Sequence, residues 1–160
     1  MPDSVRGRHA GVLLPLFSAV SSRSWGIGDI GDMVPMGRWL ARAGLDLWLM
    51  LPINEMSGGQ HSPYSALTAM AIDPIYLSLP AMADFAAVGG EASLDSGDRA
   101  MLEAVRTAPR IEYDAVRALK MRALRAAFDH FEREDLSPRT PRAAAFQEYV
   151  AAQAWWLEDY

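Results

Sequence analysis

The sequence contains no cysteine, so the chain forms neither a disulfide nor a thiolate metal site. It also lacks an apolar run close to the about 20 residues that a membrane-spanning helix needs. Residues 1–9 are polar and are not followed by the apolar segment of a signal peptide. We therefore expect a cytoplasmic protein with no membrane partner.

Positive charge is scarce as well, because 15 Lys and Arg stand against 20 Asp and Glu, which gives a formal net charge of −5. Nucleic-acid-binding domains usually carry a basic patch, so we expect no nucleic-acid partner. What the chain does have is 51% hydrophobic residues over a length of 160 residues. That is enough to bury a sizeable core, and we expect a globular fold.

The first half of the chain predicts a strand, a helix and a second strand. Residues 11–17 and 45–53 are short continuous apolar runs, typical of buried strands in a parallel sheet. Between them, apolar residues recur at helical spacing from Met36 to Ala43, with Asp32 as a candidate N-cap and Gly44 as a candidate C′ residue. This order is a βαβ unit, and it predicts an α/β fold.

The second half of the chain differs in kind. A third, weaker extended run at residues 75–79 precedes Ala- and Arg-rich sequence with helical periodicity. The best-patterned helix follows Asp114 as its candidate N-cap, and a final helix begins at Thr140 and Pro141. No stop signal follows this last helix, and two or three strands leave sheet edges unpaired. We therefore hypothesise that the chain is the N-terminal piece of something larger.

The segment Gly26–Gly31 matches G-x-G-x-x-G between a strand and a helix, which raises the possibility of a dinucleotide site. Two details weaken that interpretation. About eight residues separate Phe17 from Gly26, and Asp29 would place a carboxylate where the pyrophosphate binds. A tight turn before the helix, with Asp29 bonded to backbone amides, is favoured.

The segment 54–65 is a polar loop with one aromatic residue, directly after the most hydrophobic strand. Carbohydrate sites need hydroxyl, amide and carboxylate partners for the many sugar hydroxyls, and an aromatic ring for the apolar side of the sugar. The residues of these types are Asn54, His61, Ser62, Tyr64 and Ser65, and the first four are the candidate site residues. An Ω-type loop packed by its own side chains is the alternative. No second histidine or carboxylate stands beside His61 at metal-ligand spacing, so we predict no metal site.

Four acids lie near the strand ends, and any two of them could in principle form a glycosidase pair. They are Asp29, Asp32, Glu55 and Asp73. Each also has a simpler structural role at a turn or a helix cap, which we favour. The pair Trp155–Trp156 is predicted to lie in the core rather than to form a sugar platform.

An ordered set of short motifs runs through nearly the whole chain. The motifs are Gly11–Leu14, Trp25–Asp29, Leu51–Pro52, Ser62–Ala69, Asp73–Pro74, Tyr113, the helix around Lys120, and Trp155–Tyr160. In this order the set resembles the N-terminal region of the 4-α-glucanotransferases, the amylomaltase or disproportionating-enzyme family.

The resemblance implies a particular α/β fold, the incomplete N-terminal portion of a (β/α)₈ TIM barrel followed by a helical insertion region. Such barrels take about 250 residues or more. On this basis residues 1–80 would begin the catalytic barrel and carry the substrate-binding loop. Residues 81–160 would be a helical subdomain truncated at its C-terminus, and the rest of the barrel would follow Tyr160.

The resemblance also implies a retaining transfer of α-1,4-glucan segments between maltooligosaccharides, with no cofactor and no metal. An aspartate forms a covalent glycosyl-enzyme, a glutamate acts as acid and then base, and a second sugar replaces water. In the family these carboxylates come from later strands, so this chain would hold none of them. Ser62 and Tyr64 match family positions that contact the bound glucan.

The chain departs from the commonest family pattern at residues 52–55 and 72–74. The first departure puts Asn54 and Glu55 at the mouth of the second strand, where they could hydrogen-bond sugar hydroxyls. A non-catalytic carbohydrate-binding or partner-binding α/β module remains the alternative to an enzyme, and a dinucleotide-binding domain is a more distant one.

Overall fold

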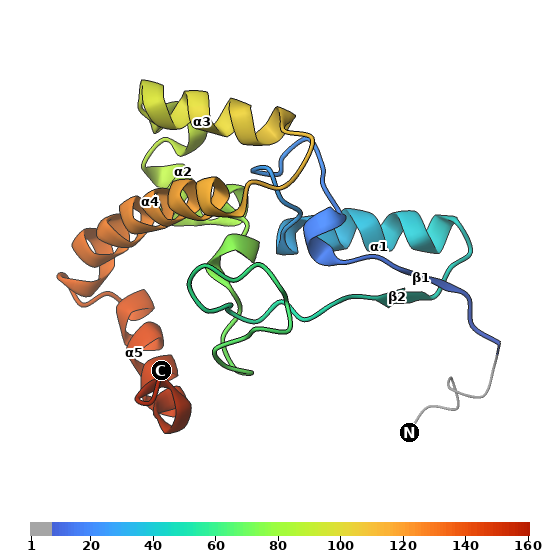
Figure 1. The fold of residues 1–160 in the computed structure, drawn as a ribbon. Coiled ribbons are helices and arrows are strands. Elements are labelled where there is room, and N and C mark those ends of the chain that lie inside the picture. Colours follow the sequence, from blue (N-terminus) through green and yellow to red (C-terminus); the bar gives the residue numbers. More distant parts are fainter. Residues whose placement is uncertain (1–7) are drawn as a thin grey trace.

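A computed structural model of the protein describes residues 8–160. Its N-terminal part contains two short parallel strands, β1 (Gly11–Leu13) and β2 (Leu47–Leu49), connected through the helix α1 (Met33–Arg42). Gly11 lies opposite Leu47 and Leu13 lies opposite Leu49. Figure 1 shows the two strands side by side with α1 running along them. The predicted order of strand, helix and strand is confirmed.

Both strands are shorter than the apolar runs that predicted them. The chain after β1 turns into a 3₁₀ helix at Leu16–Ser18, directly after Pro15. Proline has no amide to donate and cannot continue a ladder of hydrogen bonds. One further bond, from the Leu14 amide to the Leu49 carbonyl at 3.0 Å, extends the pairing beyond the strands.

The two ends of α1 are built differently. Gly44 follows its C-terminus with φ of +74°, as predicted, because a residue without Cβ adopts the left-handed conformation at low cost. At the N-terminus a single 3₁₀ turn (Ile30–Asp32) precedes the helix, and Asp29 caps it. The Asp29 side chain accepts from the Gly31 amide at 2.9 Å, and Asp32 accepts from the Asp29 amide at 3.0 Å. Asp32 thus closes a capping box and is not itself the side-chain cap of α1.

The second half of the chain is helical, as predicted. It comprises α2 (Ala83–Ala87), α3 (Ser96–Thr107), α4 (Tyr113–Phe131) and α5 (Pro141–Leu157). In Figure 1, α2 and α3 lie along α4, while α5 leads away from them to the C-terminus. A π-helical turn at Glu132–Leu136 ends α4 before the chain reverses into α5.

The predicted helix starts are right in one case and displaced in the other. Thr140 caps α5 by accepting from the Ala143 amide, and Pro141 occupies its first turn, as expected. Helix α4 begins earlier than predicted, at Tyr113, so Asp114 lies inside its first turn. An acid there still interacts favourably with the helix dipole.

The prediction of an extended run at 75–79 is wrong. The structure has two 3₁₀ turns, Pro74–Tyr76 and Leu79–Ala81. Each has proline in its first turn, where the fixed φ favours a turn over a strand. Ile75, Tyr76 and Leu79 are nonetheless buried, so the apolar run packs into the core as turns and not as a strand.

The core forms where α4 and the 3₁₀ turns pack against the segment after β1. Its most deeply buried side chains are Leu16, Trp25, Ile27, Ile75, Tyr76, Leu79, Val116 and Leu119. Trp25 packs edge-on against Phe85 with ring centroids 5.6 Å apart. Trp155, expected in the core, is 68% exposed, so that prediction is wrong for Trp155. Among residues 8–160, no helix combines the length and apolarity needed to cross a membrane.

Candidate functional site

The loop 54–73, which includes the polar segment 54–65, follows β2 and folds back on itself (Figure 1). Two antiparallel bridges join its arms, Asn54 with Ile72 and Met56 with Ala66. Backbone bonds from Glu55 to Ala71 at 3.1 Å and from Leu67 to Glu55 at 2.8 Å add to them. The loop therefore presents its outermost residues on an ordered backbone.

Asp73 closes the base of this loop. It is fully buried, and its carboxylate accepts three hydrogen bonds. The donors are the Met56 amide at 3.2 Å, the Ile75 amide at 3.0 Å and the Arg117 Nη2 at 2.6 Å. The structural role predicted for this acid is confirmed, because it joins both arms of the loop to the 3₁₀ turn and to α4.

Ser62 and Tyr64 lie at the tip of the loop. The Ser62 carbonyl accepts from the Ser65 amide at 2.9 Å, which forms a tight turn around Pro63 and Tyr64. The Ser62 hydroxyl accepts from the Tyr64 amide at 3.4 Å. The Tyr64 side chain is 73% exposed, so its ring is open to a ligand from solvent.

His61 and Asn54 are more engaged with the protein than Tyr64. The His61 ring stacks on Tyr113 of α4, with centroids 4.8 Å apart and planes 12° from parallel. Its Nε2 lies 3.5 Å from the Asp114 carboxylate. The side-chain nitrogen Nδ2 of Asn54 donates to the backbone carbonyl of Ala69 at 2.9 Å and, over a longer distance, to that of Ala71. These two residues support the loop. The other face of the His61 ring and the side-chain oxygen Oδ1 of Asn54 are left for other partners.

Glu55 is the one of the four candidate acids whose side chain caps no turn or helix within residues 8–160, so the structural role predicted for it is wrong. Partial burial raises the pKa of its carboxyl group, Asp73 nearby raises the pKa further, and Arg117 opposes the shift. Asp29 and Asp32, by contrast, bond backbone amides in the capping box, as predicted. Their carboxylates also make Gly26–Gly31 a poor place for a phosphate, which supports the turn interpretation over a dinucleotide site. Among residues 8–160, no group of three histidine or acidic side chains could hold a metal ion.

Lys120 is a central residue that the sequence analysis named only within a family motif, without predicting its buried role. It is the only lysine of the chain, and it lies on the buried face of α4 with 1% exposure. Its Nζ donates to the carbonyls of Ile75 at 2.6 Å and Leu77 at 3.0 Å, and to Asp29 at 3.2 Å. Burial lowers the pKa of this amine, and Asp29 opposes the shift. A lone lysine within the apolar stripe of a helix was the available signal.

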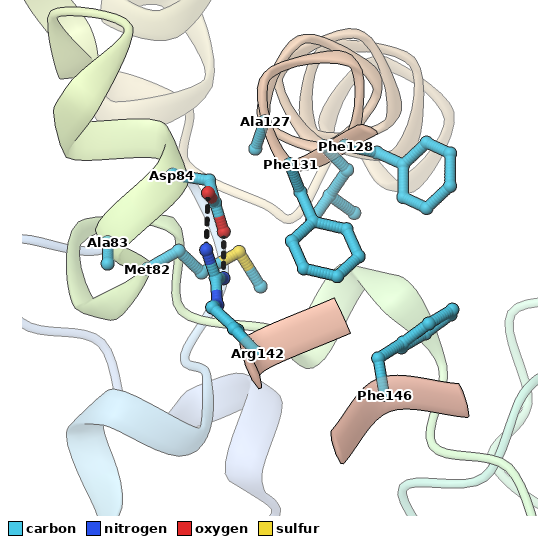
Figure 2. Close-up of a pocket in the computed structure, with 9 residues that line it drawn as sticks. Met82, Ala83, Asp84, Ala127, Phe128, Phe131, Arg142 and Phe146 are labelled. Carbon is cyan, nitrogen blue, oxygen red and sulfur yellow. Dashed lines mark hydrogen bonds and ion pairs between the residues drawn. The ribbon is translucent and has the colours of Figure 1, made fainter. Parts of the chain in front are cut away.

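A cavity of about 420 Å³ lies away from the loop, between α2, α4 and α5 (Figure 2). Its walls are largely apolar, with the rings of Phe128, Phe131 and Phe146 on one side. On the other side Asp84 pairs with Arg142, and the hydrogen bonds from that guanidinium hold the pKa of Asp84 at about 2. The cavity includes no residue of the 54–73 loop, so it is separate from the candidate site.

Comparison with known proteins supplies the family. The sequence model of glycoside hydrolase family 77, described as 4-alpha-glucanotransferase, matches residues 14–160. The chain therefore belongs to the 4-alpha-glucanotransferase family, as its motifs predicted.

Individual relatives agree with this assignment. A 4-alpha-glucanotransferase of Chlamydia caviae is 30% identical over 94% of this chain and 27% of its own length. One from Thermus thermophilus is 34% identical over 85% of this chain and 24% of its own length. The rice protein 4-alpha-glucanotransferase DPE2 is 28% identical over 96% of this chain and 16% of its own length. The chain thus spans about a quarter or less of the length of these relatives.

Proposed function

We propose that this chain is the N-terminal part of the catalytic barrel of a 4-α-glucanotransferase, and that its 54–73 loop binds the glucan. Residues 1–80 begin the barrel, and residues 81–160 form a helical subdomain. The observation that carries the proposal is the exposed Tyr64 on an ordered loop after β2, in a chain of this family. Ligand sites of parallel α/β folds lie at this end of the strands.

The loop has the chemistry that a glucan needs. The exposed ring of Tyr64 can pack against the apolar face of a glucose unit, and its hydroxyl can bond a sugar hydroxyl. The Ser62 hydroxyl, the Asn54 carbonyl oxygen and the open face of His61 add polar contacts around it. In this proposal all four residues bind substrate and none of them performs the bond exchange.

The reaction is a retaining double displacement. An aspartate attacks the anomeric carbon, and a glutamic acid protonates the departing glycosidic oxygen, which leaves a covalent glycosyl-enzyme. The glutamate then takes the proton of an acceptor sugar hydroxyl, which attacks the anomeric carbon and releases the aspartate. In the proposal both carboxylates come from later strands of the family barrel, as the resemblance implies, and Asp29, Asp32 and Asp73 bond backbone amides here.

Incubation of the full-length protein with maltotriose tests the proposal. We expect glucose together with oligosaccharides longer than maltotriose, because a sugar acceptor replaces water. Glucose and maltose without longer products would indicate hydrolysis and contradict it. Binding of maltotriose without any turnover would favour the non-catalytic module.

The isolated 160-residue chain serves as the comparison. We expect it to form no longer oligosaccharides, since the nucleophile and the acid/base lie elsewhere in the proposal. Clear disproportionation by the isolated chain would overturn the placement of the catalytic carboxylates.

A further inference from the structure

Three side chains lie on one side of α4, and two of them contact the candidate site. Tyr113, Arg117 and Lys120 stand at helical spacings of four and three residues, which places them on a common face. Tyr113 stacks on His61 near the tip of the loop, Arg117 reaches Asp73 at its base, and Lys120 bonds the carbonyls of the following 3₁₀ segment. Helix α4 therefore contacts the loop at more than one level.

Arg117 is connected to the backbone of the loop arms through the Asp73 carboxylate. Its Nη2 lies 2.6 Å from Oδ2 of Asp73, and that same oxygen accepts from the Met56 amide at 3.2 Å. Met56 is bridged to Ala66, two residues from Tyr64. A continuous set of short contacts thus runs from the guanidinium through one carboxylate oxygen to the arm that carries the exposed ring.

The opposite charges of Arg117 and Asp73 make their contact decisive for the geometry at the base of the loop. A fully buried carboxylate without a cation is strongly disfavoured, and it relaxes by drawing in water or by moving its backbone partners. Arg117 is the basic side chain paired with Asp73, and it is about one third exposed. Loss of its charge would therefore be felt at Met56 and Ile75, the two amides that Asp73 holds.

We propose that Arg117 is a positioning residue for the glucan-binding loop: by fixing the buried Asp73 carboxylate, it sets the placement of the arm that presents Ser62 and Tyr64. This inference rests on the proposed function for its effect on glucan binding. Its structural part, that Arg117 orders the 54–73 backbone, stands independently of the substrate.

The test compares Arg117→Met with Arg117→Lys in the full-length protein by hydrogen–deuterium exchange and maltotriose kinetics. In Arg117→Met we expect faster amide exchange across 54–73, by about tenfold, because the bonds at the loop base open more often. We expect KM for maltotriose to rise about three- to tenfold with a smaller change in kcat. Arg117→Lys keeps the charge and should restore part of both values.

Arg106→Met is the matched control. Arg106 pairs with Glu91 at 2.6 Å and is similarly shielded from solvent, but it contacts no residue of the loop. A purely stabilising role for Arg117 predicts that both variants lower the melting temperature and that neither changes exchange in 54–73 or KM. That result would overturn the proposal. If the wild-type protein shows no glucan turnover, the proposed function fails, and the exchange of the loop amides alone decides whether Arg117 positions it.

Discussion

Lys120 links two segments that are distant in sequence, the turn at Asp29 and the chain after Asp73. All three of its ammonium hydrogens have acceptors, which offsets the desolvation of the buried charge. Removal of Lys120 should destabilise the protein mainly through its former partners, because Asp29 stays buried without its cation.

Replacing Lys120 with methionine should lower the free energy of unfolding by about 3–5 kcal/mol, since it leaves a buried carboxylate without its cation. Urea unfolding of the protein measures this effect. Arg125→Met is the control, because Arg125 is largely exposed and pairs with Asp129 only at the surface. A loss of at most about 0.5 kcal/mol is expected there. Equal losses in the two variants would contradict the role assigned to Lys120.

Asp84 lies at the edge of the apolar cavity (Figure 2), and its titration should make the free energy of unfolding depend on pH. The hydrogen bonds from Arg142, with a contribution from His130, lower its pKa to about 2 from a usual value of 3.8. Because the folded state has the lower pKa, its stabilisation is fully present above about pH 4 and is lost as the pH falls through 2.

Urea unfolding of wild type and Asp84→Asn between about pH 5 and pH 2 tests this prediction. The wild type should be more stable by up to about 2 kcal/mol at the higher pH, and the difference should shrink as Asp84 is protonated. A difference that stays constant over this range would contradict the assignment.

At the scale of elements, Gly28 in the segment before α1 lies so close to another stretch of backbone that a side chain does not fit. A Cβ added to Gly28 would lie 2.1 Å from the Leu16 carbonyl oxygen and 2.8 Å from the Ala19 backbone. These are backbone atoms of the 3₁₀ helix after β1, so they cannot rotate away. The Gly28 amide also donates to the Phe17 carbonyl at 3.1 Å. The close approach explains a glycine there without any phosphate ligand.

A pair of glycine-to-alanine variants tests this account, because the two should change the stability of the protein in opposite directions. Gly28→Ala should destabilise the protein by about 1–3 kcal/mol or more, because the backbone must shift to admit the methyl group. Gly37→Ala, in the exposed middle of α1 with no atom near the new Cβ, should stabilise it by about 0.5–1 kcal/mol. Thermal unfolding measures both. A neutral Gly28→Ala would show that the close approach is not a constraint.

Sequence reasoning succeeded where local chemistry decides the structure. Gly44 after α1 and Thr140 with Pro141 before α5 were predictable, because caps depend on neighbours within one turn. It failed at 75–79, where an apolar run suits a strand and a buried turn equally well. Here Asp73 and Pro74 decide in favour of a turn.

The candidate site was predictable in its residue types and not in its construction. The composition of the loop identified Ser62 and Tyr64, whose binding role stays a prediction. The supporting contacts join residues far apart along the chain, 44 positions for Arg117 with Asp73 and 91 for Lys120 with Asp29. Such pairs follow from tertiary packing, and no local pattern indicates them.

At the scale of the whole molecule, the sheet is small and open. Leu13, Leu47 and Leu49 are all more than half exposed, although parallel strands usually bury both faces. A completed barrel would cover these side chains with further strands and helices, which agrees with the proposal that residues 1–80 begin one. The relatives, of which the chain matches about a quarter or less, are long enough to supply that cover.

The most direct test of the account is the effect of Tyr64→Ala on maltotriose kinetics in the full-length protein. We predict a rise in KM equivalent to about 1–3 kcal/mol of binding, because the exposed ring and its hydroxyl are lost from the proposed glucan site. Tyr149→Ala, which removes another largely exposed tyrosine, in α5, should leave KM unchanged. Unchanged KM and kcat in Tyr64→Ala would contradict the assignment of the 54–73 loop to the glucan.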